Sequence, residues 1–209
     1  MHRSLVIGVV LFLSFGCQGD TPAEPGSGSE PVTAPVPPPF GGTIFIDADI
    51  ITAADPTTFR ELSYSGQEAR TMYDRRVDGW ITVDPYLFDA SFDDGLRIEV
   101  QVNPEFQTVA DDQVEAERYA EAAGRLPTVL RLDVETMWIH QGVQPFGGGN
   151  NSLLIHVGQA DLYVADGILE ETLVHEAAHT SLDAADSASE GWLAAQAADP
   201  TFISNYARD

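Results

Sequence analysis

The stretch 173–183 constrains this chain more than any other, because two histidines stand four residues apart in it, His175 and His179. Positions i and i+4 lie on the same face of an α-helix, so both imidazoles can point a nitrogen at one position in space. Glu176 follows the first histidine directly and can hold a water beside that position. Apolar residues at helical spacing give the same segment a second face to bury. We therefore expect a helix over 167–183 that carries a divalent metal site.

The order His-Glu-x-x-His is the arrangement of zinc hydrolases. Two imidazoles hold the ion, and the carboxylate takes a proton from the water that attacks the substrate. His175 and His179 are thus the expected ligands of Zn²⁺, and Glu176 is the expected general base. Chance produces this spacing far less than once in a chain with 5 histidines. The alternative is a structural pair of histidines on a packed helix.

A catalytic zinc site usually has three protein ligands and one open position. Asp183 lies two turns, about 12 Å, along the helix axis from His175. We therefore expect it to orient an imidazole rather than to bind the ion. Glu190 could fold back to the site after the following turn, whereas His140 and His156 have no useful spacing and are predicted to be strand histidines with satisfied hydrogen bonds.

The charge of the chain excludes two classes of partner. Acidic residues outnumber basic ones by 33 to 10, the formal net charge is −23, and every basic residue is an arginine. Such a chain repels nucleic acid and anionic lipid headgroups, so neither is an expected partner. The simplest interpretation of the charge is solubility in a salty medium.

Residues 1–17 are interpreted as an export signal. A basic start precedes the apolar run 5–15, which is too short to span a bilayer comfortably. The run ends in Gly16-Cys17, which resembles a bacterial lipoprotein signal, and Cys17 is the single cysteine. We expect a lipid on Cys17 to anchor the protein to the bacterial outer membrane or cell envelope. An ordinary signal peptide would instead give a periplasmic or secreted protein.

Residues 18–40 are rich in Pro, Gly, Ser and Thr and contain almost nothing to bury. This composition predicts a disordered tether. The remainder, 41–209, has the length of one ordinary domain with its own core.

Within this domain, alternating or continuous apolar runs predict strands over 43–51, 80–92, 96–102, 134–140 and 152–157. Helical spacing and capping residues predict helices over 67–77, 111–123, 167–183, 189–198 and 201–208. Asp111-Asp112 is expected to cap the second of these helices, and Gly124 is expected to end it. Asp93-Asp94-Gly95 is a turn that makes a hairpin of the strands around it, and 141–151 is expected to be a flexible loop.

This succession predicts an α+β fold with a small mixed sheet. In such a fold the strand before the helix with the histidines can form the sheet edge that borders a cleft, where an extended peptide could pair with it. Residues 153–157 are the candidate for that edge strand. The alternative is a plain interior strand.

The C-terminal part carries further motifs: Trp192-Leu193-Ala194-Ala195, Phe202-Ile203-Ser204 and Tyr206-Ala207-Arg208-Asp209. Together with 174–183, they make the chain similar to a group of bacterial zinc metallopeptidases related to the lethal-factor-type gluzincins. The resemblance implies a zincin-like fold and a peptide or protein substrate. It also implies that Tyr206 donates a hydrogen bond to the developing oxyanion, and a packing tyrosine is the alternative.

In those peptidases a glutamate that follows the Tyr-x-Arg segment completes the zinc site. The present chain ends at Asp209, before such a residue, which implies either a C-terminally truncated sequence or a chain without its third ligand. The expected function is zinc-dependent hydrolysis of peptide bonds with Glu176 as general base. The alternative is a non-catalytic exported lipoprotein, with a degenerate zincin fold, that binds peptide or carbohydrate.

Overall fold

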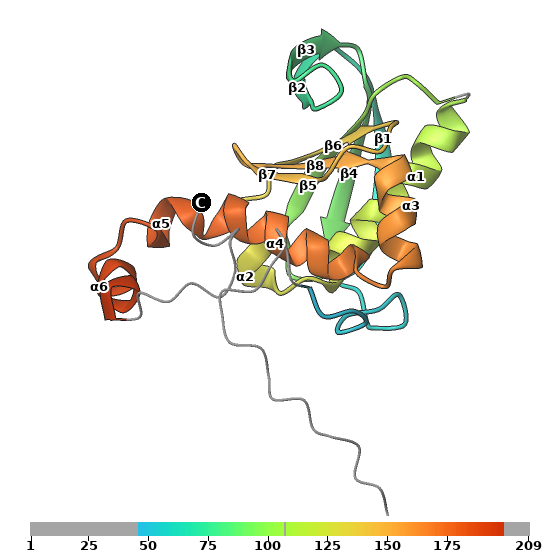
Figure 1. The fold of residues 1–209 in the computed structure, drawn as a ribbon. Helices are drawn as coiled ribbons and strands as arrows, with labels where there is room; N and C mark the ends of the chain where they lie inside the picture. Colours follow the sequence, from blue (N-terminus) through green and yellow to red (C-terminus); the bar gives the residue numbers. More distant parts are fainter. Residues whose placement is uncertain (1–45, 107, 199–209) are drawn as a thin grey trace, which may run out of the picture. The chain divides into compact units, whose positions relative to one another are not determined.

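The computed structural model describes residues 46–106 and 108–198 (Figure 1). The predicted export signal with Cys17, the tether, the helix over 201–208 and Tyr206 therefore lie outside the described residues. Within the part that is described, no helix is long and apolar enough to cross a membrane.

A six-stranded mixed sheet, in the order β1-β4-β5-β6-β8-β7, forms the centre of the domain. Its strands are β1 (Phe59–Gln67), β4 (Tyr86–Phe92), β5 (Arg97–Val102), β6 (Thr136–His140), β7 (Gly147–Gly149) and β8 (Ser152–His156). The pairs β5–β6 and β6–β8 are parallel, and the other pairs are antiparallel. A separate antiparallel hairpin consists of β2 (Arg70–Asp74) and β3 (Gly79–Val83).

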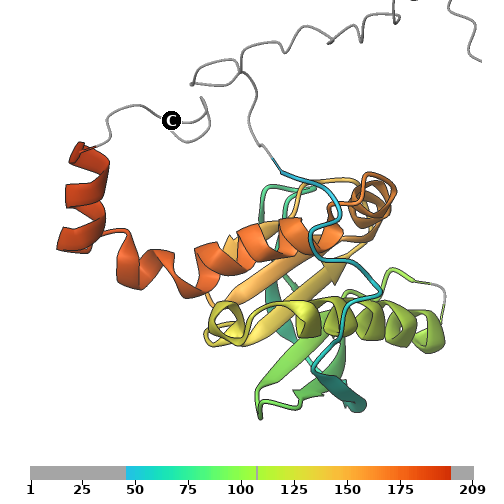
Figure 2. The ribbon, with the colours of Figure 1, turned by 90° about the horizontal axis from the view of Figure 1, so that it is seen from below.

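Helices cover one face of the sheet and the β2–β3 hairpin lies over the other (Figure 1). The helices are α1 (Val109–Arg125), α2 (Thr128–Arg131), α3 (Val157–Ala165), α4 (Leu169–Ser181), α5 (Asp183–Asp186) and α6 (Glu190–Ala198). Figure 2 shows α1 and α4 crossing the same face of the sheet, while α5 and α6 continue the chain beyond α4.

Strand β5 shows how the sequence places the core. Ile98, Val100 and Val102 alternate with polar residues along it and are buried, as a half-buried strand requires. They pack in one cluster with residues of α1 and with Leu173 and Ala177 of α4. Burial of each large aliphatic side chain contributes about 1.5–3 kcal/mol, so this cluster fixes α4 against the sheet.

Strands β6 and β8 are covered on both faces, which explains their nearly continuous apolar sequences. Met137 and Leu153 face the helices. Trp138 and Leu154 face the other way and pack with Met72 of the hairpin. The hairpin therefore forms a second, smaller core on the far side of the sheet.

Several predicted elements are confirmed. The domain combines helices with a mixed sheet, so the α+β class is correct at this coarse level. The antiparallel pair β4–β5 is the predicted hairpin, and Gly95 in its turn has a positive φ of 87°, which glycine adopts at little cost. The helices over 167–183 and 189–198 correspond to α4 and α6.

The helix predicted over 67–77 is wrong, because this segment forms β2 and the following turn. Met72 and Asp74 are buried while Thr71 is exposed, which is a period of two rather than of 3.6. The pairing Met72↔Ile81 with β3 is a non-local contact. Local spacing of apolar residues could not reveal it.

The strand predicted over 43–51 is also wrong for its described part, since residues 46–51 form turns and bends. The Asp49 amide donates to the Gly167 carbonyl at 2.8 Å, and the Ile51 amide donates to Glu171 Oε1 at 2.7 Å. The backbone hydrogen bonds that a strand would give to a neighbour thus go to the start of α4.

The start of α1 differs from the prediction as well. Thr108, and not the Asp111-Asp112 pair, is the N-cap, and its side chain accepts from the Asp111 amide at 3.3 Å. Gly124 lies inside the helix because the segment 57–59 crosses it: a Cβ there would lie 2.7 Å from the Phe59 nitrogen. Gly124 therefore does not end the helix. Its lack of a side chain allows the segment 57–59 to pack closely against α1.

Candidate metal centre and the adjoining groove

Helix α4 places the two predicted ligands on the side away from the core. Leu173 and Ala177 are fully buried beneath the helix, whereas His175, Glu176 and His179 are partly exposed. The helical spacing that buries one face therefore presents the three candidate residues on the other.

The two imidazoles face one another. His175 Nε2 and His179 Nε2 are 3.1 Å apart, and the ring planes cross at 88°. A tetrahedral zinc with Zn–N distances of about 2.0–2.1 Å separates two nitrogen ligands by about 3.3 Å. The spacing of these two nitrogens therefore fits a shared zinc ion with a very small adjustment.

Asp183, the first residue of α5, lies beside the second imidazole. Its Oδ2 is 2.7 Å from His179 Nδ1. A carboxylate on Nδ1 places the ring proton there, which leaves Nε2 as the nitrogen that can bind a metal. Asp183 thus occupies the position of an imidazole-orienting residue.

Glu176 is half-buried at the edge of the sheet, and the backbone of Gly148 hydrogen-bonds to it. Burial raises the pKa of its carboxyl group above the ordinary value, while His175, His179 and Arg75 act in the opposite direction. A carboxylate with a raised pKa is a better proton acceptor than an ordinary exposed glutamate.

Strand β7, which consists of Gly147, Gly148 and Gly149, was expected to be the centre of a flexible loop and is instead the edge strand of the sheet. A Cβ at Gly148 would lie 1.8 Å from the carbonyl oxygen of Glu176, so only glycine allows strand and helix to pack this closely. Glycine in a strand often marks such close backbone approach, and this was the signal that could have revealed β7.

Thr180 joins α4 to the same edge. Its Oγ1 accepts from the Gly149 amide at 2.8 Å and lies 3.1 Å from the carbonyl oxygen of Ser152. The hydroxyl thereby bridges β7 and β8 at the end of their pairing. The predicted edge strand over 153–157 is correspondingly wrong: β8 pairs with β6 on one side and β7 on the other.

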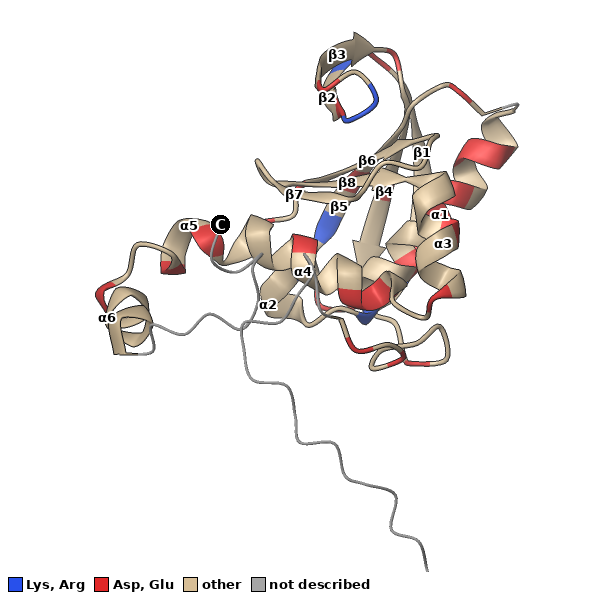
Figure 3. Ribbon diagram, in the orientation of Figure 1, with Lys and Arg blue, Asp and Glu red and all other residues tan. Residues whose placement is uncertain are grey.

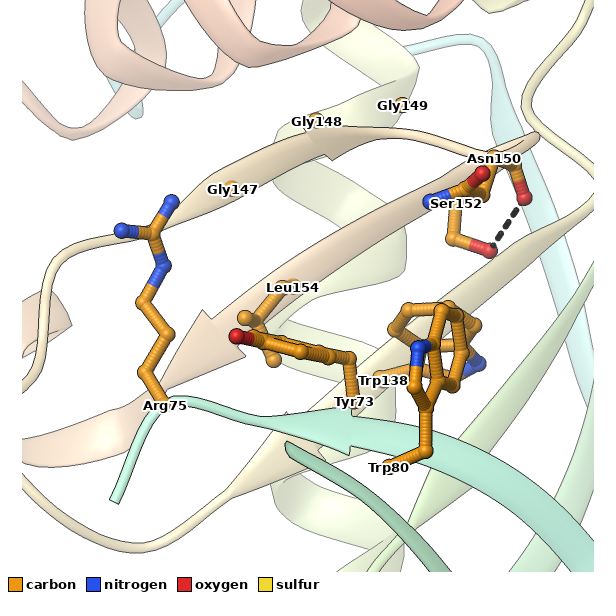
Figure 4. Close-up of a pocket in the computed structure, with 10 residues that line it drawn as sticks. All are labelled: Tyr73, Arg75, Trp80, Trp138, Gly147, Gly148, Gly149, Asn150, Ser152 and Leu154. Atoms are coloured by element: carbon orange, nitrogen blue, oxygen red, sulfur yellow. Dashed lines mark hydrogen bonds between the residues drawn. The ribbon is translucent and has the colours of Figure 1, made fainter. Parts of the chain in front are cut away.

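On the face of the sheet opposite α4, a groove lies between the hairpin and strands β6, β8 and β7 (Figure 4). We call it the aromatic groove and define it by Tyr73, Arg75, Trp80, Trp138 and Leu154, with β7 as its rim. The Tyr73–Trp80 and Trp80–Trp138 ring centroids are 5.5 and 5.4 Å apart, with nearly perpendicular planes. Such edge-to-face contacts make the wall rigid.

The remaining predicted residues do not join the site within the described ranges. No group of three His, Cys, Asp or Glu side chains that could hold a metal occurs there. Glu190, at the start of α6, is accordingly not brought to the imidazole pair. His140 and His156 lie on β6 and β8 and are fully buried, so the prediction of strand histidines is confirmed. Both ring nitrogens of His140 have partners, whereas His156 Nε2 has none among the described residues.

No family model, no curated protein and no solved structure matches this chain.

Proposed function

We propose that this protein is a zinc-dependent peptidase with a zincin-like site on α4. The observation that carries the proposal is the pair of Nε2 atoms, from His175 and His179, that lie 3.1 Å apart. The half-buried carboxylate of Glu176 lies beside them, against the sheet edge. By the resemblance described above, an acidic residue that remains to be identified completes the ligand set and Tyr206 is the oxyanion donor. The lipid anchor on Cys17 belongs to the same proposal.

The donor set suits zinc, because two neutral imidazoles at tetrahedral spacing are preferred ligands of this ion. When bound, Zn²⁺ supplies a Lewis acid that acidifies water and polarises a carbonyl group. The protein's own contribution is the orientation of His179 through Asp183, at 2.7 Å.

Glu176 performs the proton transfers of the proposed reaction. It accepts a proton from the attacking water and passes it to the nitrogen of the leaving amine. The contact with the Gly148 backbone holds the carboxylate in place. Burial raises the pKa of Glu176, so its carboxylate accepts a proton more readily than that of an exposed glutamate.

The substrate class follows from the sheet edge beside Glu176. Among the described strands none pairs with the outer side of β7, and an extended peptide can add to such an edge through backbone hydrogen bonds. Peptide binding at β7 replaces the earlier expectation of binding at 153–157. A peptide on this edge would bring a backbone carbonyl close to Glu176.

The decisive experiment compares the purified protein with Glu176→Gln for zinc content and for cleavage of a mixed peptide library, read by mass spectrometry. The substitution removes the base and keeps both imidazoles, so zinc should be retained while cleavage falls by about 10²–10⁴-fold. Equal cleavage by the variant would contradict the role of Glu176. Peptide or carbohydrate binding without cleavage by the wild type would favour a non-catalytic binding lipoprotein.

A further inference from the structure

Among the residues that the structure describes, Arg75 forms no ion pair, although the chain is strongly acidic. Asp and Glu are distributed over the whole described fold (Figure 3), and most of the described arginines form ion pairs with them. Among the arginines that the structure describes, only Arg75 and Arg97 make no such pair. With 33 acidic residues available to 10 arginines, an arginine left without one is free to bind a carboxylate of another molecule.

The guanidinium of Arg75 stands at the rim of the aromatic groove. Figure 4 shows it directed from the turn after β2 towards Gly147 of β7, and its Nη2 would be 3.1 Å from a Cβ built there. Its positive charge reaches Glu176, whose pKa it lowers in part. Arg75 and Glu176 thus lie against neighbouring residues of β7, because Arg75 is next to Gly147 and the backbone of Glu176 is next to Gly148.

The groove has the size and lining for one side chain rather than for a large ligand. It encloses about 280 Å³, just below the 300–1,000 Å³ of typical small-molecule sites. Trp138 and Leu154 form a buried apolar floor, while Trp80 is 55 % exposed at the wall.

The three glycines of β7 leave this groove open to the outer edge of the strand. No side chain of Gly147, Gly148 or Gly149 stands between a peptide at that edge and Arg75. Successive side chains of an extended peptide point to opposite faces of the sheet. Every second side chain would therefore point towards the hairpin and could reach across β7 into the groove.

We infer that Arg75 is a specificity-determining residue, which pairs with a carboxylate of a peptide bound along the edge of β7. The carboxylate belongs either to an Asp or Glu side chain or to the C-terminus of the peptide. The carbon atoms of the peptide next to this carboxylate lie in the aromatic groove. The inference rests on the proposed function, because it takes the ligand to be a peptide.

The test uses Arg75→Glu, with Arg97→Glu as the matched control, since Arg97 is an exposed, unpaired arginine on β5. Four peptides of one sequence are compared, with Glu or Gln at one central position and with a free or an amidated C-terminus. Binding is measured by the fluorescence of Trp80 and Trp138 in the Glu176→Gln background, and cleavage is measured separately in protein with Glu176 intact.

Arg75 is exposed, so we expect the wild-type groove to bind one of the acidic forms about two- to fivefold more tightly than its neutral counterpart, as for an exposed ion pair. Arg75→Glu should abolish or reverse this preference, and Arg97→Glu should keep it. Loss of affinity on amidation identifies the C-terminal carboxylate, and loss on replacing Glu by Gln identifies the side chain. Equal binding of all four peptides, or an unchanged preference in Arg75→Glu, would overturn the inference.

Failure of this inference can be told apart from failure of the proposed function. Arg75-dependent binding of acidic peptides without any cleavage would refute the peptidase and leave the role of Arg75 standing. Cleavage with the same preference in both arginine variants would refute the role of Arg75 and leave the peptidase standing.

Discussion

Two pairs of histidines in this protein resemble one another in spacing and differ in chemistry. His140 and His156 are opposite each other on neighbouring strands, with ring centroids 5.5 Å apart. His175 and His179 lie one turn apart on one helix, with ring centroids 4.6 Å apart and perpendicular ring planes. Proximity alone therefore does not distinguish a structural pair from a candidate metal site.

The partners of the ring nitrogens make the distinction. In the strand pair, Asn103 contacts His140 Nδ1 at 3.0 Å, the carbonyl oxygen of Tyr73 lies 3.1 Å from His140 Nε2, and the carbonyl of Gln141 lies 3.0 Å from His156 Nδ1. These groups contact three of the four ring nitrogens, and His156 Nε2 is buried without a hydrogen-bond partner among the described residues. In the helix pair the two Nε2 atoms face the same point, and a carboxylate holds the far side of His179.

The largest predicted difference is between two alanine substitutions, His179→Ala in the helix pair and His156→Ala in the strand pair. His179→Ala should lose zinc and reduce peptide cleavage by about 10³-fold, since metal assistance is worth several kcal/mol. Its stability should change little, because the His179 side chain is 38 % exposed. His156→Ala should keep its zinc and lose about 2 kcal/mol of unfolding free energy from the cavity left in the sheet. Zinc analysis and urea unfolding of both variants check this, and zinc loss in His156→Ala would break the distinction.

A smaller effect is expected from the residue that orients the helix pair. Asp183→Asn removes the charge that faces His179 Nδ1 while keeping the size of the side chain. Zinc affinity should fall by about 10–100-fold, as for other partners of metal-binding histidines. Asp186→Asn, an exposed acid on the same short helix, is the control and should leave the affinity unchanged. Competition with a zinc chelator measures both affinities, and equal affinities would mean that Asp183 does not act on the site.

The smallest effect concerns the strand pair and pH. Burial lowers the pKa of His140 from 6.5 to about 4, and burial also lowers that of His156. At pH values between 4 and 6.5, His140 is protonated more often in the unfolded chain than in the folded one. The free energy of unfolding therefore falls as the pH decreases from 6.5 towards 4. From pH 7 to pH 5 the loss due to His140 should be about 2 kcal/mol.

Urea unfolding at several pH values tests this expectation, with His140→Gln as the comparison because glutamine does not titrate. The variant should show a shallower dependence on pH across that window. Parallel curves for the two proteins would show that His140 does not carry the dependence.

Much of the fold followed from local patterns. The alternation of Ile98, Val100 and Val102 predicted β5, and the apolar run before His140 predicted β6. The positions of His140 and His156 on strands were also predicted, because each ends an apolar run of strand type. These predictions succeed because periodicity within one element reflects which side of that element is covered.

The errors share a different cause. The spacing of Met72, Tyr73 and Val77 predicts a helix over 67–77, yet cross-strand pairing with β3 makes residues 70–74 a strand. The glycines of β7 predict a flexible loop, because the backbone of a glycine run can adopt many conformations when nothing packs against it. In both places a contact with a distant part of the chain determines the conformation.

The sequence by itself determined the chemistry that α4 presents: His175 and His179 one turn apart, with Glu176 between them, follow from the geometry of any α-helix. Only the tertiary structure decided that β7 is the edge strand, that the backbone of Gly148 contacts Glu176, and that Arg75 stands at the rim of an aromatic groove. Helical spacing is a property of neighbouring residues. A sheet edge and its groove exist only once segments far apart in the chain have packed together.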